Sequence, residues 1–98
     1  MDLKDKTIVL TGATGGIGRE LVKRLDSNGA RLILVSKNES ELSSLLKSLK
    51  NKESVYFASD FSNQRETIDT AKKISNTYPN IDILINAAGI GIYKPIEE

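Results

Sequence analysis

The chain contains no cysteine and no histidine among its 98 residues. The absence of cysteine excludes disulfides, thiolate nucleophiles and thiolate metal ligands within this chain. The absence of histidine excludes a Ser-His-Asp triad and a histidine-bound metal. Because the lack of cysteine leaves the redox compartment open, we take the cytoplasm as the default expectation.

Strong net charge and long apolar runs are also lacking. The formal net charge is +1, which predicts binding neither to nucleic acid nor to a membrane surface. No segment approaches the roughly 20 apolar residues that span a bilayer. The apolar run that follows the charged residues 1–6 is too short for a signal peptide. The length suits one small domain, so we expect residues 1–98 to form a single cytoplasmic domain.

Short apolar runs alternate with segments of helical periodicity. The apolar runs predict strands at residues 7–10, 31–36, 55–58 and 81–85. Helical spacing predicts helices from near Gly16 to residue 28, over residues 39–50 and over residues 64–77, the last with Ile68, Ala71 and Ile74 buried. We expect Asn38 and Ser62 to cap the second and third helices. The alternation predicts an α/β fold, a truncated Rossmann-type doubly wound parallel sheet with strand order 3-2-1-4.

A glycine-rich segment, Thr11-Gly12-Ala13-Thr14-Gly15-Gly16-Ile17-Gly18, joins the first strand to the first helix. Glycine has no Cβ, so the backbone can turn tightly and a pyrophosphate can approach the peptide N–H groups. The helix that follows would direct its positive dipole end at such an anion. A turn that merely needs positive φ would look similar, but the strand before it and the helix after it favour a dinucleotide-binding unit.

Three further loops follow the carboxyl ends of predicted strands. They contain Ser36 with Lys37, Asp60, and the segment Asn86-Ala87-Ala88-Gly89. In an open parallel sheet, ligands bind outside the carboxyl ends of the strands, where the strand order reverses. We therefore expect all four loops to meet at one ligand-binding edge.

Three motifs carry a family resemblance. The first strand leads into Thr-Gly-x-x-x-Gly-x-Gly, carried by Thr11, Gly12, Gly16 and Gly18, and the fourth leads into Asn-x-Ala-Gly. Asp60 follows the third strand. In this order the motifs resemble the N-terminal, cofactor-binding half of the short-chain dehydrogenase/reductase family. The resemblance implies an oxidoreductase that transfers hydride between a nicotinamide dinucleotide and a carbonyl or alcohol.

The resemblance also implies roles for individual residues. The pyrophosphate turn would comprise Gly12, Thr14, Gly15, Gly16, Ile17 and Gly18, with Ile17 on the nicotinamide side unless it packs in the core. Asp60 and the Phe61 backbone would contact the adenine, although Asp60 could instead cap a helix beside Ser62. Asn86 would pin the fourth strand, and Ala87, Ala88 and Gly89 would border the ribose of the cofactor.

The end of the second strand bears on the choice of cofactor. A carboxylate there would bind the ribose 2′-OH of NAD and repel the 2′-phosphate of NADP. Ser36 and Lys37 stand there instead, with no carboxylate before Glu39. Lys37 would attract a 2′-phosphate, so we favour NADP over NAD. In the family that the motifs resemble, many NADP-preferring members carry a second basic residue at the position of Gly15, and Lys37 could instead be a solvated loop lysine.

The catalytic half implied by the resemblance is missing. That half would supply a tyrosine acid/base, a lysine four residues later, a serine and an asparagine. None of the three tyrosines, Tyr56, Tyr78 and Tyr93, has a lysine four residues later. We therefore expect the 98-residue chain alone to be inactive and its substrate site to be incomplete. One alternative is a stand-alone nucleotide-binding or regulatory module without redox activity. Another is the longer branch of the superfamily, because Gly12, Gly15 and Gly18 also fit Thr-Gly-x-x-Gly-x-x-Gly.

The end of the chain gives a further expectation. Residues 91–98 read as a loop that begins a helix after Pro95. The fourth strand would then be an exposed apolar edge at residues 83–85, and such an edge invites pairing with another chain. We expect self-association through it.

Overall fold

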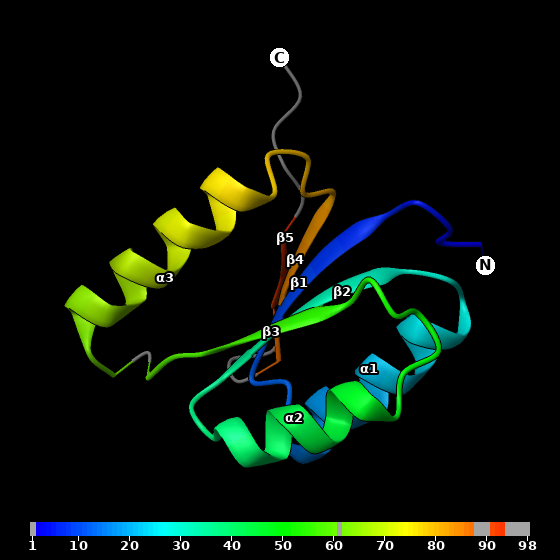
Figure 1. Cartoon of the computed structure of the whole chain (residues 1–98), viewed down its shortest axis with the longest axis horizontal. Helices are drawn as coiled ribbons and strands as arrows, with labels where there is room; N and C mark the ends of the chain where they lie inside the picture. Colours follow the sequence, from blue (N-terminus) through cyan, green and yellow to red (C-terminus); the bar gives the residue numbers. More distant parts are fainter. Residues whose placement is uncertain (1, 61, 88–90, 94–98) are drawn as a thin grey trace.

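A twisted sheet forms the centre of the molecule in a computed structural model, which describes residues 2–60, 62–87 and 91–93, the last three by their backbone alone (Figure 1). The strands are β1 (Thr7–Thr11), β2 (Arg31–Ser36), β3 (Val55–Ala58), β4 (Ile83–Asn86) and β5 (Gly91–Tyr93). They lie in the order β3-β2-β1-β4-β5, and the first four are parallel. The predicted α/β fold and the order 3-2-1-4 are confirmed.

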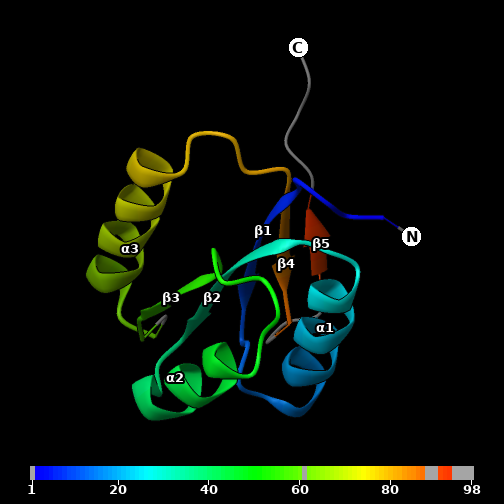
Figure 2. The same cartoon turned by 45° about the vertical axis from the view of Figure 1, so that its right-hand side comes forward.

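Three helices cover the two faces of the sheet. Helices α1 (Gly16–Ser27) and α2 (Glu39–Lys47) lie on one face, and α3 (Gln64–Thr77) lies on the other (Figures 1 and 2). The crossovers from β1 to β2 and from β2 to β3 advance in one direction, so right-handed connections put both helices on the same face. The connection from β3 back to β4 runs the opposite way and places α3 across the sheet.

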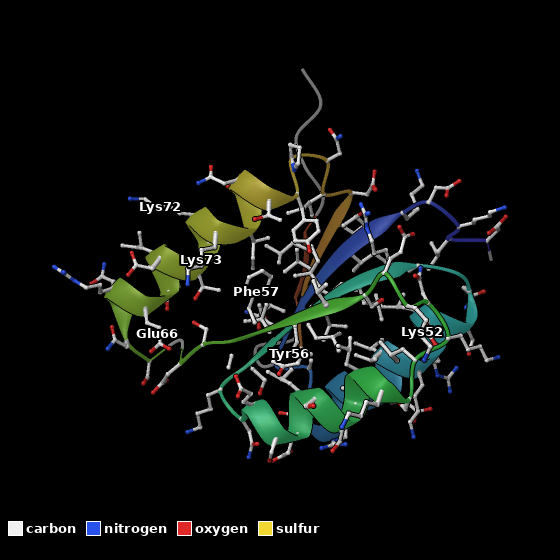
Figure 3. All side chains as sticks on the ribbon, in the orientation of Figure 1. Lys52, Tyr56, Phe57, Glu66, Lys72 and Lys73 are labelled. Atoms are coloured by element: carbon white, nitrogen blue, oxygen red, sulfur yellow. The ribbon has the colours of Figure 1, made fainter. Side chains whose placement is uncertain are left out.

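The core follows the alternation of side chains along each strand. In β2, Leu32 and Leu34 face α1 and α2, whereas Ile33 and Val35 belong to the cluster that contains Ile74 of α3. In β3, Tyr56 and Phe57 likewise lie on opposite faces (Figure 3). The strands β1 and β2 therefore read as continuous apolar runs because both of their faces are buried.

The face that carries α3 is only partly covered. A groove of about 300 Å³ lies between α3 and strands β1 and β4, and Leu84 on its wall is 40% exposed. Ile74 is buried as predicted, but Ile68 is 46% exposed and Ala71 is exposed, so the prediction for these two is wrong. Helix α3 turns Thr70 and Ile74 towards the sheet, and both are buried. Ile68 is two residues before Thr70, which places it on the opposite side of the helix.

Asparagine side chains set the starts of α2 and α3. Asn38 accepts a hydrogen bond from the backbone N–H of Glu41, which confirms the predicted cap of α2. The predicted Ser62 cap is wrong, because Asn63 accepts from the N–H of Glu66. Ser62 instead donates its hydroxyl to Asp60. Helix α2 also ends earlier than predicted, at Lys47.

The prediction that β4 is a free edge is wrong. The prediction of a loop over residues 91–98 is also wrong at residues 91–93. Residues Gly91–Tyr93 form β5, which pairs antiparallel with β4 and opposes Tyr93 to Leu84. The N–H and C=O groups at this side of β4 thereby find partners in the same chain. The edge through which we expected self-association is occupied by β5, and residues 94–98, with the predicted helix after Pro95, lie outside the described residues.

The helices of the described residues are all too short or too polar to cross a bilayer.

Candidate functional site

The loops that leave β1, β2 and β3 meet at one side of the sheet (Figure 1). They surround a hollow of about 250 Å³. Its lining combines backbone, hydroxyl and charged groups from Thr11, Gly12, Val35, Ser36, Lys37, Ser59, Asp60 and Ser62. Four of the residues predicted to bind the cofactor thus line one hollow: Gly12, Ser36, Lys37 and Asp60.

The glycines of the segment that joins β1 to the first turn of α1 have different structural roles. Gly12 has a φ of +67°, a conformation that other residues rarely adopt. Gly18 is buried, and a Cβ there would lie 2.1 Å from the carbonyl oxygen of Gly12. A Cβ on Gly16 would meet no atom of the described residues within 4 Å, apart from its chain neighbours and the backbone of its own helix. The backbone conformation therefore favours glycine at Gly12, and close packing requires it at Gly18, whereas the described residues leave space beside Gly16.

The start of α1 lacks the side-chain cap that α2 and α3 have. Its N-cap residue is Gly15, and no acidic residue stands in its first turn. The N–H of Arg19 is bonded to the carbonyl of Gly15, which begins the helical ladder. The N–H groups of the first turn precede that ladder, and such groups together with the positive end of the helix dipole suit an anion.

Hydroxyl groups tie the glycine turn to both neighbouring strands. Thr14 Oγ1 and Ser36 Oγ are 2.7 Å apart, which joins the turn to the end of β2. Thr11 Oγ1 donates to Asn86 Oδ1 at 3.0 Å, and the N–H of Ala87 donates to the Thr11 carbonyl. Asn86 and Ala87 therefore lie beside the turn, at the end of β4.

Asp60 is held by its neighbour Ser62. Its Oδ1 accepts the hydroxyl of Ser62 at 2.7 Å and the N–H of Ser62 at 3.0 Å. These two hydrogen bonds, with a smaller contribution from the charge of Lys37, keep the pKa of Asp60 below its ordinary value. The carboxylate is thus ionised at neutral pH and can accept a further hydrogen bond from a ligand.

Replacing Ser62 by alanine is expected to raise the pKa of Asp60 towards its ordinary value, because the hydroxyl bond is the largest cause of the shift. Since the folded pKa is the lower one, the stability from these bonds is complete above about pH 3.9, the ordinary aspartate value. It is lost as the pH falls through the folded pKa. NMR titration of the Asp60 side-chain carbon checks this, and an identical titration curve in both proteins would contradict it.

Sequence reasoning missed an ion pair beside the site. Arg19 in α1 donates through Nη2 to Glu41 Oε2 in α2 at 2.9 Å, across 22 positions of sequence. Arg19 also donates through Nε to the carbonyl of Thr14. Neither residue belongs to a motif, and no signal in the sequence pairs them.

The remaining predicted site residues fall in two groups. Ile17 is 53% exposed, so the alternative that it packs in the core is wrong. Phe61, Ala88 and Gly89 lie outside the described residues.

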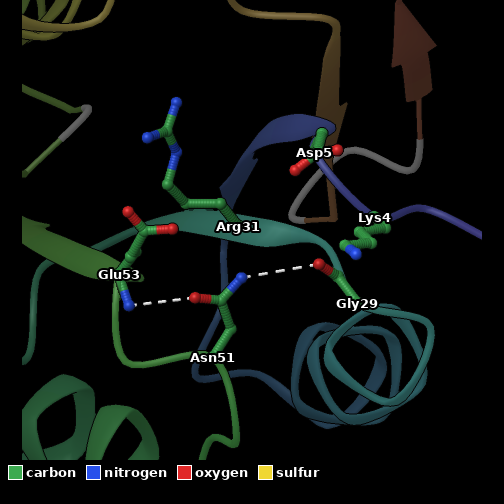
Figure 4. Close-up of a pocket in the computed structure, with 6 residues that line it drawn as sticks. All are labelled: Lys4, Asp5, Gly29, Arg31, Asn51 and Glu53. Atoms are coloured by element: carbon green, nitrogen blue, oxygen red, sulfur yellow. Dashed lines mark hydrogen bonds between the residues drawn. The ribbon is translucent and has the colours of Figure 1, made fainter.

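A second hollow, of about 390 Å³, lies at the amino ends of the strands, opposite the candidate site (Figure 4). It carries charges of both signs, from Lys4, Asp5, Arg31 and Glu53. Asn51 on its wall donates to the carbonyls of Gly29 and Ala30 and accepts from the N–H of Glu53. These bonds hold together the turns that enter β2 and β3.

The sequence matches the short chain dehydrogenase family over residues 6–98. The chain belongs to the short-chain dehydrogenase/reductase family. Its relatives include an uncharacterised oxidoreductase of Staphylococcus saprophyticus, 33% identical over all of this chain and 43% of that protein. A diacetyl reductase of Staphylococcus epidermidis, described as (S)-acetoin forming, is 32% identical over 95% of this chain and 37% of its own length.

Solved structures of the family share the fold. A protein described as a short chain dehydrogenase from Escherichia coli superposes with a TM-score of 0.77 at 28% identity, over 87% of this chain and 40% of that one. A Bacillus anthracis short chain dehydrogenase, 23% identical, gives a TM-score of 0.74 over 86% of this chain and 34% of its own. This dehydrogenase/reductase chain thus spans less than half of the length of its relatives. Family membership implies binding of a nicotinamide dinucleotide.

Proposed function

We propose that this chain is the cofactor-binding part of a short-chain oxidoreductase and that it prefers NADP(H) to NAD(H). The observation that carries the preference is the position of Lys37, exposed at the hollow directly after β2. A lysine there attracts a 2′-phosphate, and β2 offers no carboxylate that would accept the 2′-OH of NAD. Ser36 adds a hydroxyl beside it.

The other loops supply groups for the rest of a dinucleotide. The uncapped first turn of α1 would hold the pyrophosphate over the open space at Gly16. The ionised Asp60 would accept a hydrogen bond from the adenine amino group. The exposed Ile17 would lie on the nicotinamide side of the turn, and Asn86, through Thr11, would keep β4 in register beside it.

A bound nicotinamide would supply hydride exchange with a carbonyl or alcohol. The residues of this chain would bind and orient the dinucleotide. Proton transfer to the substrate would fall to residues elsewhere in the whole protein, because the 98 residues contain no Tyr-x-x-x-Lys. The 98-residue chain alone is therefore proposed to be inactive.

Calorimetric titration of the full natural chain with NADPH and with NADH tests this proposal. We expect NADPH to bind at least tenfold more tightly, a difference of about 1.4 kcal/mol. Tighter binding of NADH would overturn the cofactor preference and leave the dinucleotide site standing. Binding of neither would overturn the site, and binding without carbonyl reduction or alcohol oxidation would favour a nucleotide-binding module.

A further inference from the structure

One arginine joins two loops of the proposed cofactor site: the glycine turn at the pyrophosphate and the segment after β2 at the 2′-phosphate. Arg19, in the first turn of α1, uses its planar guanidinium twice, donating to the Thr14 carbonyl and to Glu41, each at 2.9 Å. The side chains of Arg19 and Glu41 are 42% and 43% exposed. Ion pairs with such exposure contribute little to stability, so stability alone gives no reason for this arrangement.

Arg19 completes the hydrogen bonding of one peptide group in the glycine turn. The carbonyl of Thr14 accepts from Arg19 Nε, and the N–H of the same peptide, on Gly15, donates to the Gly12 carbonyl at 3.2 Å. With both polar atoms bonded on opposite sides, the orientation of this peptide is fixed. The next N–H along the chain is that of Gly16, the first residue of α1.

Glu41 is itself held at the start of α2. Its backbone N–H donates to Asn38 Oδ1, the cap of that helix. The guanidinium therefore links the glycine turn to the segment that carries Lys37 and Asn38. The hydroxyls of Thr14 and Ser36 make a second link between the same two segments.

We propose that Arg19, anchored by Glu41, is a positioning residue for the pyrophosphate turn. It fixes the orientation of the Thr14–Gly15 peptide and thereby directs the first N–H groups of α1 towards the cofactor phosphates. The inference rests on the proposed function. Because NADH and NADPH share the pyrophosphate, loss of Arg19 weakens both by the same factor, whereas a residue that reads the 2′-phosphate affects NADPH alone.

The test measures NADH and NADPH binding to Arg19→Met, Glu41→Ala and the double variant of the full natural chain. We expect Arg19→Met to weaken both about tenfold, as befits a lost charge-assisted hydrogen bond. Glu41→Ala weakens both less, and the double variant is no worse than Arg19→Met. Arg19→Lys restores part of the affinity, because an ammonium keeps the charge but lacks the fixed fork.

Arg24→Met is the matched control. Arg24 lies on the same helix and pairs with Glu20 at 3.4 Å, with both side chains mostly exposed. Its loss is expected to leave binding unchanged, and the melting temperatures of all these variants are expected to match the wild type.

Three results would overturn the inference: unchanged binding in Arg19→Met, a loss confined to NADPH, or tighter NADPH binding in Glu41→Ala. The second would make Arg19 a direct contact of the 2′-phosphate. The third would make Glu41 its competitor. If the wild type binds neither dinucleotide, the proposed function fails and this inference fails with it. If the wild type binds both and Arg19→Met binds equally well, only the positioning role is wrong.

Discussion

Gly18→Ala is expected to destabilise the protein by about 3 kcal/mol or more, at the upper end of what overpacking usually costs. The added Cβ would lie 2.1 Å from the Gly12 carbonyl oxygen and 3.0 Å from two backbone atoms of Ala13. Backbone atoms cannot rotate away as the end of a side chain can. Gly12 already has positive φ, and Ala13 is completely buried, so the turn has little room to move.

Gly16→Ala is the matched control for this experiment. Among the described residues, no atom outside its own helix and chain neighbours lies within 4 Å of the added Cβ, and alanine favours a helix over glycine by up to about 1 kcal/mol. Stability should therefore be unchanged or slightly higher. If the open space at Gly16 admits the pyrophosphate, the same variant loses dinucleotide affinity while it stays folded. Urea unfolding followed by circular dichroism gives the stabilities, and equal losses in both variants would contradict the packing argument.

Lys37→Glu is expected to weaken NADPH binding about 100-fold and NADH binding less than threefold. A hydrogen bond to a charged group contributes about 1.5–3 kcal/mol, and the introduced carboxylate would also repel the 2′-phosphate. The same carboxylate could accept the ribose 2′-OH of NADH. The preference for NADPH should therefore fall by at least about 30-fold, which would reverse a tenfold preference.

Two further variants sharpen this test. Lys72→Glu makes the same charge change on α3, away from the hollow (Figure 3), and should alter neither affinity. Lys37→Arg keeps the charge and should keep the NADPH preference. Fluorescence titration of both cofactors measures all four proteins. Equal weakening of NADH and NADPH in Lys37→Glu would show that Lys37 acts on a part of the cofactor that the two share.

Much of the fold and of the site could be predicted because the signals are local. Continuous apolar runs mark strands buried on both faces, and their alternation with helices leaves few topologies for a right-handed chain. Parallel strands bring their carboxyl ends to one edge, so Lys37 and Asp60 could be placed together from their positions in the chain. Asn38 could be recognised as a cap because a cap acts within three residues.

Choices between equivalent residues could not be made from the sequence pattern. Ser62 and Asn63 are both good caps at neighbouring positions. In the structure Asn63 accepts from the N–H of Glu66, whereas the Ser62 hydroxyl donates to Asp60, two residues before it. Ile17 fits the apolar periodicity of α1, yet it is exposed because the helix begins at the open side of the turn. Ile68 is exposed because α3 turns Thr70 and Ile74 towards the sheet, which leaves Ile68 on the opposite side of the helix.

The sequence by itself thus determined the parallel order of the first four strands, the glycine turn and the edge at which its loops meet. These depend on periodicity and on the conformational freedom of glycine, which act over a few residues. Only the tertiary structure decided that β5 covers β4, that Gly18 rather than Gly16 is required by packing, and that Arg19 pairs with Glu41. Each of these depends on how closely the backbone and side chains approach once the chain has folded back on itself, over a few residues at β5 and Gly18 and over 22 positions at Arg19 and Glu41. Periodicity along the sequence does not give these distances.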